Sequence, residues 1–242
     1  MTVTPIHLRD AKHEDIADNV IAVGDPGRVE LLSSLLEDSR VVNKHRGFLI
    51  VTGYYKNSRV TLATHGIGGA SSAIVFEELR MLGAKRIVRL GTAGGLVKEL
   101  SVGSIVVASG AGYLCNGAAL GLYSLNHCLA TAPDPVLTAK IIEKMKANNI
   151  EYQVAPVFSS DSFYAEDPKL AEKLSSAGFK AIEMECATLF ALGWMRGFST
   201  AAVLVISDNL VEEKKVFLTT MELRDKFEKV ARIVMDVFSE LK

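Results

Sequence analysis

Residues 20–32 read VIAVGDPGRVELL, and this stretch decides how the chain is interpreted. An apolar run, Val20–Val23, stops at the turn Gly24–Gly27, and Arg28 opens an amphipathic segment. The pattern predicts a buried strand, a tight turn and a helix. Two interpretations of the turn stay open. Glycine and proline form tight turns of every kind, but glycine N–H groups, a helix N-terminus and an arginine also form anion sites.

Composition limits the class of protein. The chain has 242 residues, 49% of them hydrophobic and 23% charged, which is typical of a globular protein with a large core. It carries 27 Lys and Arg against 28 Asp and Glu, with no basic run, so we expect no nucleic-acid partner. No apolar segment is long enough to span a bilayer, and the polar first residues lack the apolar centre of a signal peptide. We therefore expect a cytosolic protein with no membrane partner.

The cysteines indicate neither a metal site nor a redox pair. Cys115, Cys128 and Cys186 have no CxxC spacing, and an odd number argues against a secreted disulfide framework. We therefore expect no bound metal. One cysteine could still bridge to its copy in an oligomer, although such bonds are rare in the cytosol outside hyperthermophiles.

Short β-branched runs alternate with longer amphipathic segments. Helices are predicted for the segment SSAIVFEELRMLG, with serine caps and an end at Gly83, for DPVLTAKIIEKMKANN, with Asp134 as N-cap, for ECATLFALGWMRG, and for 219–241. Strands are predicted at 20–24, 48–54, 60–64, 86–91, 104–108, 153–158, 181–184 and 201–207. This alternation predicts one α/β domain over residues 1–242, with a mostly parallel sheet between two layers of helices and ligands at the carboxyl ends of the strands.

The segment RLGTAGGL, residues 89–96, contains an arginine inside an apolar strand. Its glycines, at 91, 94 and 95, do not fit the dinucleotide-binding fingerprint, so an NAD-dependent dehydrogenase is disfavoured. Burying Arg89 without a partner would be costly. Both a structural ion pair and a bound anion would explain it. In the second case Arg28 is the natural companion, and the pair with a Gly-Thr turn would form a phosphate cradle.

Three acidic residues stand near strand ends. Glu183 and Glu185 flank Met184 in AIEMECATLF, and they could bind sugar hydroxyls or simply favour the start of a helix. Asp208 ends the apolar strand AAVLVISDNL, where it is either a helix cap or a general-acid candidate with a raised pKa.

Six motifs, in their order along the chain, closely resemble those of the trimeric/hexameric nucleoside phosphorylase superfamily: GDPGR, HRGF, RLGTAGGL, FSSDSFY, EMECATLF and ISDNL. Within that superfamily the chain resembles the hexameric purine nucleoside phosphorylases and the 5′-methylthioadenosine phosphorylases. The resemblance covers nearly the whole chain. It implies a three-layer α/β/α fold around a mostly parallel, twisted mixed sheet.

The resemblance also implies a role for particular residues. Those expected to bind phosphate are Gly24, Arg28, Arg46, Arg89 and Thr92, with Arg46 reaching a neighbouring subunit's site. Those expected to bind the nucleoside are His7 (from a neighbour, near the sugar 5′ position), Phe163, Tyr164, Ile182, Glu183, Met184, Glu185 and Ser207. Asp208 would protonate or hydrogen-bond N7 of the purine. Arg224 is the best match for a second catalytic arginine, with a solvated helix residue as the alternative.

The implied reaction is reversible phosphorolysis of purine nucleosides to a free base and ribose 1-phosphate. Inorganic phosphate is a co-substrate, and no cofactor is expected. Inosine, guanosine, adenosine and 5′-methylthioadenosine are all open as substrates, and a 5′-methylthioadenosine-specific phosphorylase is the alternative. A nucleoside hydrolase and a non-catalytic nucleoside-binding module are more distant. The resemblance further implies a homo-oligomer, a hexamer built as a trimer of dimers.

Overall fold

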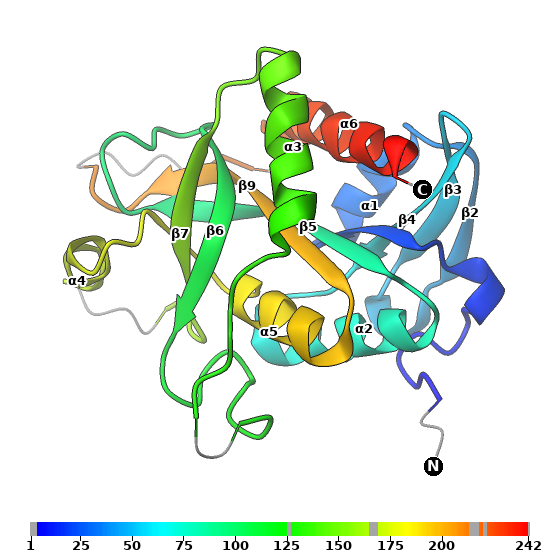
Figure 1. Ribbon diagram of the computed structural model, residues 1–242, viewed down its shortest axis with the longest axis horizontal. Coiled ribbons are helices and arrows are strands. Elements are labelled where there is room, and N and C mark those ends of the chain that lie inside the picture. The colour runs from blue at the N-terminus through cyan, green and yellow to red at the C-terminus, as the bar shows by residue number, and fades with distance from the viewer. Residues whose placement is uncertain (1–3, 125–126, 165–168, 213–217, 220–221, 242) are drawn as a thin grey trace.

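A computed structural model describes residues 4–124, 127–164, 169–212, 218–219 and 222–241. One nine-stranded sheet runs through it in the order β2-β3-β4-β1-β5-β8-β7-β6-β9 (Figure 1). β5 also pairs with β9, so the strands from β5 to β9 in this order form a closed ring. The strands are β1 Asn19–Val23, β2 Glu37–Asn43, β3 Ile50–Tyr55, β4 Ser58–Thr64, β5 Arg86–Gly95, β6 Ile105–Tyr113, β7 Gln153–Ser159, β8 Ala181–Glu183 and β9 Ser199–Asn209.

Helices cover both faces of the sheet, as Figure 1 shows. On one face lie α2 and α5, and on the other lie α1, α3 and α6, each face with its own hydrophobic cluster. The helices are α1 Pro26–Ser33, α2 Gly68–Met81, α3 Pro135–Ala147, α4 Leu170–Ser176, α5 Cys186–Arg196 and α6 Arg224–Glu240, with 3₁₀ turns at His13–Asp15 and His45–Gly47. The expected three-layer α/β/α fold is confirmed.

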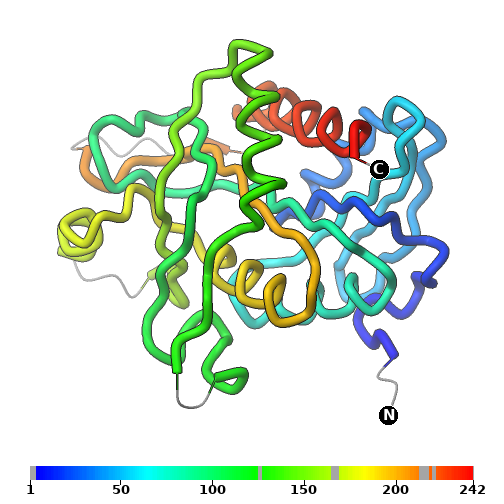
Figure 2. The backbone as a smooth tube through the Cα atoms, in the orientation of Figure 1, coloured from blue at the N-terminus to red at the C-terminus, as the bar shows by residue number. Residues whose placement is uncertain are grey.

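Five strand pairings among the described residues are parallel and four are antiparallel, so the sheet is mixed and mostly parallel. β5 and β9 run side by side along their whole length through the centre (Figure 2), from Arg86 opposite Ser199 to Gly95 opposite Asn209. This pairing brings the ends of β5 and β9 together. No helix of the described part of the chain is long and apolar enough to cross a membrane.

The local predictions hold where a cap or an apolar face is strong. Asp134 caps α3 by accepting a hydrogen bond from the Leu137 N–H at 2.9 Å. The apolar face predicted for the C-terminal helix is buried along α6, including Phe227 and Val234. Asp25 caps α1 directly after β1, where the Gly27 N–H donates to Oδ1 at 2.9 Å. The strand-turn-helix unit predicted from residues 20–32 is therefore present.

Three local predictions are wrong. β2 was not predicted, because most of its residues are exposed and show no alternation of apolar and polar side chains. α2 begins at Gly68, so Ser71 and Ser72 lie inside the helix and bond to the backbone oxygens of His65 and Gly69 instead of capping it. β5 continues past Gly91 to Gly95 without a turn. Its glycines leave space for neighbouring side chains, such as Arg89 against Gly91 and Leu210 against Gly94.

Candidate active site

One pocket of about 680 Å³ lies at the strand ends. Residues from the turn after β1, from β5 and β8, and from the end of β9 line it. It brings together eleven of the residues singled out from the sequence: Gly24, Arg28, Arg89, Thr92, Phe163, Ile182, Glu183, Met184, Glu185, Ser207 and Asp208. These residues lie far apart in the sequence, and the order of the strands in the sheet brings them together in one pocket.

Arg28 projects from the first turn of α1 and is held from two sides. Its guanidinium carbon lies 4.4 Å from the centre of the Phe227 ring of α6, and its Nη2 donates to Thr92 Oγ1 at 3.4 Å. A cation over an aromatic face is stabilised by the ring quadrupole. Burial and the charge of Arg89 lower the pKa of Arg28 to about 10, so it stays protonated at neutral pH. The smaller part of this lowering comes from the like charge of Arg89, which an anion between the two guanidinium groups would offset.

Arg89 lies within β5, is 4% exposed and is held by two carboxylates. Its Nε donates to Glu183 at 3.2 Å and its Nη2 to Glu185 at 2.5 Å. Burial acts to lower the pKa of Arg89, but the two carboxylates outweigh it and raise the pKa overall. Both interpretations of Arg89 from the sequence thus have support, because a structural ion pair and a place in the pocket wall coexist.

Gly91 explains how the Arg89 side chain fits. The two residues stand on the same face of β5, and a Cβ atom on Gly91 would lie 2.5 Å from Arg89 Nη1 and 2.6 Å from its Cζ. The guanidinium therefore folds across the bare backbone of Gly91. The glycine in RLGT is required for the position of the arginine.

Glu183 is saturated by donors from the protein. Its carboxylate accepts hydrogen bonds from the N–H groups of Glu185 and Cys186, at 2.8 and 2.9 Å, as well as from the Ser159 hydroxyl and Arg89. A carboxylate at a helix N-terminus is also favoured by the helix dipole. Glu183 thus ties Arg89 to the start of α5. Its side chain is 1% exposed, so the structure gives it an orienting role in the pocket wall.

Glu185 stands between the arginine and the rest of the pocket. One oxygen pairs with Arg89, and the other accepts the Gly68 N–H at the start of α2, at 2.7 Å. Burial raises the pKa of Glu185, a change that the Arg89 charge opposes and the Glu183 charge reinforces. Because it also lines the pocket, this carboxylate can accept hydrogen bonds from a ligand there.

The pocket also carries an acid and an aromatic ring. Asp208 is the second-last residue of β9 and accepts a hydrogen bond from the Ser207 hydroxyl at 2.8 Å. Phe163 lies in the loop after β7, lines the pocket and is 58% exposed, with the Tyr164 ring 5.0 Å away in an edge contact. Met184 also lines this space. A flat heterocycle that needs a hydrogen bond at one edge would fit between such groups.

Four of the singled-out residues do not line this pocket. Tyr164 is 95% exposed beside it. Arg46 is exposed on the 3₁₀ turn before β3 and has a positive φ of 55°. His7 donates from Nδ1 to the Glu78 carboxylate at 2.8 Å, and Arg224 forms an ion pair with Glu228, also at 2.8 Å. The structure therefore supports the solvated alternative for Arg224, while the expected cross-subunit roles of His7 and Arg46 stay predictions.

The sequence reasoning also missed residues of the site. Asn209 and Ser160 line the pocket, and Asn209 donates to the backbone oxygens of Val97 and Leu100 at 2.9 Å. His65 is fully buried next to Arg89, with the two side chains 3.1 Å apart. The sequence does carry a signal for His65, which directly follows a predicted strand and stands beside glycines in THGIGG. Arg28 stands beside glycines after a predicted strand in the same way.

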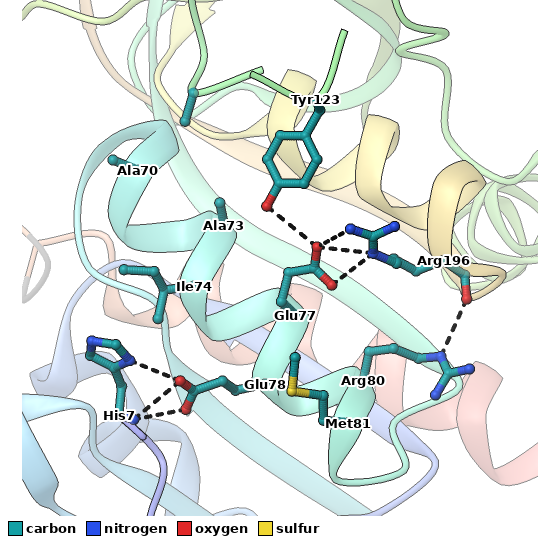
Figure 3. A pocket seen from close by; sticks show the side chains of 11 residues that line it. His7, Ala70, Ala73, Ile74, Glu77, Glu78, Arg80, Met81, Tyr123 and Arg196 are labelled. Carbon is teal, nitrogen blue, oxygen red and sulfur yellow. Dashed lines mark hydrogen bonds and ion pairs between the residues drawn. The ribbon is translucent and has the colours of Figure 1, made fainter. Parts of the chain in front are cut away.

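A second hollow, of about 760 Å³, lies on the outer side of α2 (Figure 3). We call it the α2 groove; it is lined by His7, Ala70, Ala73, Ile74, Glu77, Glu78, Arg80, Met81, Ala119, Tyr123 and Arg196. Figure 3 shows two separate clusters in it: Glu77 with Tyr123 and Arg196, and Glu78 with His7. Among the described residues, no group of three or more His, Cys, Asp or Glu side chains could hold a metal ion, and the three cysteines are free.

The chain is similar to known enzymes over nearly all of its length. It is 33% identical to a guanosine phosphorylase of Halorubrum lacusprofundi, over 94% of this chain and 95% of that protein. It is 36% identical to a DeoD-type purine nucleoside phosphorylase of Streptococcus suis, over 87% of this chain and 89% of that protein. A crystal structure of purine nucleoside phosphorylase from Toxoplasma gondii, in complex with immucillin-H, shares the fold with a TM-score of 0.88 at 24% identity, covering 98% of both chains.

The match to a family confirms the resemblance inferred from the motifs. The family model described as the phosphorylase superfamily matches residues 18–241. That range spans the whole pocket, from Gly24 to Leu210, together with the helices on both faces of the sheet. The chain belongs to the phosphorylase superfamily.

Proposed function

We propose that this protein is a purine nucleoside phosphorylase, a pentosyltransferase that cleaves purine nucleosides with inorganic phosphate. The products are a free purine base and ribose 1-phosphate. One observation carries the proposal: two neighbouring arginines and Thr92 share a pocket with an acid and an exposed aromatic ring. The names of the similar enzymes, a guanosine phosphorylase and several purine nucleoside phosphorylases, support the same chemistry.

Phosphate would lie between the guanidinium groups of Arg28 and Arg89, with the Thr92 hydroxyl and the backbone at Gly24 as further donors. Arginine binds phosphate through parallel N–H groups, and the pocket keeps this region partly dry. A phosphate fixed there stands beside the sugar, where it is both the nucleophile and the negative charge that stabilises a cationic sugar in the transition state.

The nucleoside would occupy the remaining space. Glu185 would accept hydrogen bonds from the ribose hydroxyls and Met184 would pack on the sugar. Phe163 would stack on the base, and Ile182 and Ser207 would complete the wall. Cleavage of the glycosidic bond sends an electron pair to the base, and Asp208 would offset that charge by donating a proton or a hydrogen bond at N7. The reaction so described uses no organic cofactor.

The test is the release of free base from inosine, guanosine, adenosine and 5′-methylthioadenosine, each with and without inorganic phosphate. The proposal expects release with phosphate only, and from more than one purine nucleoside. Release from 5′-methylthioadenosine alone would restrict the enzyme to that substrate. Equal release with and without phosphate would make the protein a hydrolase, and no release in either case would make it a binding module.

The same proposal includes a homo-oligomer, a hexamer built as a trimer of dimers. His7 and Arg46 lie outside the pocket of their own chain, which is the arrangement that residues completing a neighbouring site would have. Light scattering after size-exclusion chromatography would measure the mass. A monomer with full activity would contradict a shared site. The proposed compartment is the cytosol, which cell fractionation would test.

A further inference from the structure

His65 is a buried titratable residue to which the proposed reaction gives no part. It follows β4, is fully buried, and its Nε2 lies 3.1 Å from Arg89 Nη1. A guanidinium nitrogen only donates, so Nε2 accepts, the ring proton lies on Nδ1 and the imidazole is neutral. Burial and the charge of Arg89 lower the pKa of His65 well below its ordinary value, which is consistent with this assignment.

The histidine completes a three-point hold on Arg89. Glu183 from β8 holds Nε, Glu185 before α5 holds Nη2, and His65 after β4 holds Nη1. Three contacts from three separate elements fix the orientation of a planar group. They use three of the five N–H donors of the guanidinium, whose other donors belong to Nη1 and Nη2, and the Cys186 thiol also interacts with the group.

A neutral acceptor suits this position better than a third carboxylate. Arg28 and Arg89 carry two positive charges, and Glu183 and Glu185 carry two negative charges when ionised. A further carboxylate at the place of His65 would add a third negative charge against Arg89 and would repel an anion bound there. The imidazole orients Arg89 without neutralising it.

Packing alone does not explain a histidine here. Its Nδ1 has no partner of good hydrogen-bond geometry among the residues that the structure describes, and only the backbone of the adjacent Gly66 acts on the ring as an acceptor. A buried donor without a partner costs free energy, which an apolar side chain of the same size would avoid. The ring does pack on Phe76, with centroids 5.4 Å apart, but a phenyl ring could do the same. The bond from Arg89 to Nε2 is the contact that a phenyl ring could not make, because it needs a hydrogen-bond acceptor.

We propose that His65 is a positioning residue that holds the Arg89 guanidinium in the plane from which its remaining N–H donors bind phosphate. The identity of the anion rests on the proposed function. The orientation of Arg89 rests on the hydrogen bonds themselves.

The test compares three variants of the full-length protein. His65→Phe keeps a ring beside Phe76 and removes the acceptor, while His65→Asn keeps a polar side chain too short to reach Arg89 as Nε2 does. His65→Gln returns an amide oxygen near the position of Nε2. We expect the first two to raise KM for phosphate about tenfold with kcat at saturating phosphate changed less than about threefold. We expect His65→Gln to recover most of the loss.

A matched control separates positioning from packing. Phe76→Leu disturbs the same part of the core without touching Arg89, so it should lower Tm and leave KM for phosphate unchanged. Unchanged KM for phosphate in both His65→Phe and His65→Asn would overturn the proposal. So would an equal loss in all three variants, since a purely structural role predicts no recovery by glutamine.

Direct binding of inorganic phosphate distinguishes this proposal from the function itself. Isothermal titration calorimetry measures Kd for phosphate without any nucleoside or turnover. Phosphate-independent base release by the unmodified protein would defeat the proposed function. In that case a tenfold weaker Kd in His65→Phe, restored by His65→Gln, would still support the role of His65, and an unchanged Kd would overturn it.

Discussion

The pocket at the strand ends and the α2 groove differ in how their charged side chains are arranged. The two are similar in volume, about 760 Å³ for the groove and 680 Å³ for the pocket. The two acids of the groove each have a basic partner, Arg196 with Glu77 at 2.8 Å and His7 with Glu78 at the same distance, while Arg80 donates to the Arg196 backbone oxygen. In the pocket two arginines are close enough for the charge of one to lower the pKa of the other. Volume therefore does not identify the active site.

The pocket keeps its like charges near one another at a cost in stability. Arg28 rests on the Phe227 ring, and Arg89 is buried between acids and a neutral histidine. Burying charged groups is expensive even when they are paired. Such an arrangement is typical of a site whose ligand completes the charge balance. In the groove no like charge among the described residues acts on the pKa of Arg196, and four predictions test this difference, from the largest effect to the smallest.

Asp208→Asn should have the largest effect. It removes the acid that would offset charge on the departing base, so we expect kcat for inosine to fall by about 10³-fold. Asp38→Asn is the matched control, because Asp38 is exposed on β2 far along the sheet order and has a φ of 47° that asparagine tolerates. Steady-state kinetics checks both. A fall of less than tenfold in Asp208→Asn would remove Asp208 from the acid role.

Gly91→Ala tests whether the position of Arg89 depends on the bare backbone beneath it. The new methyl group would occupy the space of Nη1 and Cζ, so the guanidinium must move. We expect kcat/KM for phosphate to fall about 30-fold, the range of one or two charged hydrogen bonds. Gly110→Ala in β6 is the control, since the nearest atom to its added Cβ, Thr131 O, is at an ordinary 3.6 Å. Equal phosphate kinetics in the two variants would contradict the account.

Phe227→Leu tests the aromatic support of Arg28. Loss of the ring face should raise KM for phosphate about threefold, the value of a modest cation–π contact. Phe238→Leu on the same helix is equally buried but is not the ring beneath Arg28. Both variants should lower Tm, and only the first should change KM for phosphate. A similar change of KM in both would assign the effect to the core instead.

Glu78→Gln tests the groove and should leave phosphate kinetics unchanged. Glu78 accepts from the N–H groups of residues 6, 7 and 8 and pairs with His7. Burial acts to raise the pKa of Glu78, but these hydrogen bonds outweigh it and lower the pKa below 4.5. A lowered pKa means that ionised Glu78 stabilises the folded state fully above pH 4.5, and that this stability is lost as the pH falls through the lowered pKa.

Thermal unfolding across pH measures this contribution. The Tm of Glu78→Gln should lie below that of the unmodified protein at pH 7, and the difference should shrink as the pH drops below 4.5. Glu143→Gln, at an exposed position of α3, should show no difference at any pH. A difference that stays constant, or grows towards low pH, would show that the charge of Glu78 is not what anchors the N-terminal segment.

The sequence predicted the parts of the molecule that depend on local chemistry. The turn at residues 24–27, the cap at Asp134 and the buried face of α6 follow from residues close together in the chain. The pocket was predictable for a related reason, since parallel strands carry their carboxyl-terminal residues to one edge of the sheet. Arg28 and Arg89 stood out because charge after or within an apolar strand requires a partner.

What escaped prediction depends on contacts distant in sequence. β2 is defined by its pairing with β3 and not by its own pattern. The length of β5 depends on β9, which pairs with Gly91 and Thr92 where the sequence predicts a turn, and on β8, which pairs with Gly94 and Gly95. His65 acquires its role only when β4 and β5 both lie beside β1. The α2 groove joins α2 to the N-terminal segment and the end of α5, which no local pattern connects.

The central claim is that the two arginines hold phosphate as the nucleophile. The most direct measurement incubates the purified protein with inosine and inorganic phosphate and follows the phosphorus signal by ³¹P NMR while free hypoxanthine is quantified. The account predicts one ribose 1-phosphate for each base released, and no release when phosphate is left out. Free ribose in place of ribose 1-phosphate, at a rate independent of phosphate, would contradict it.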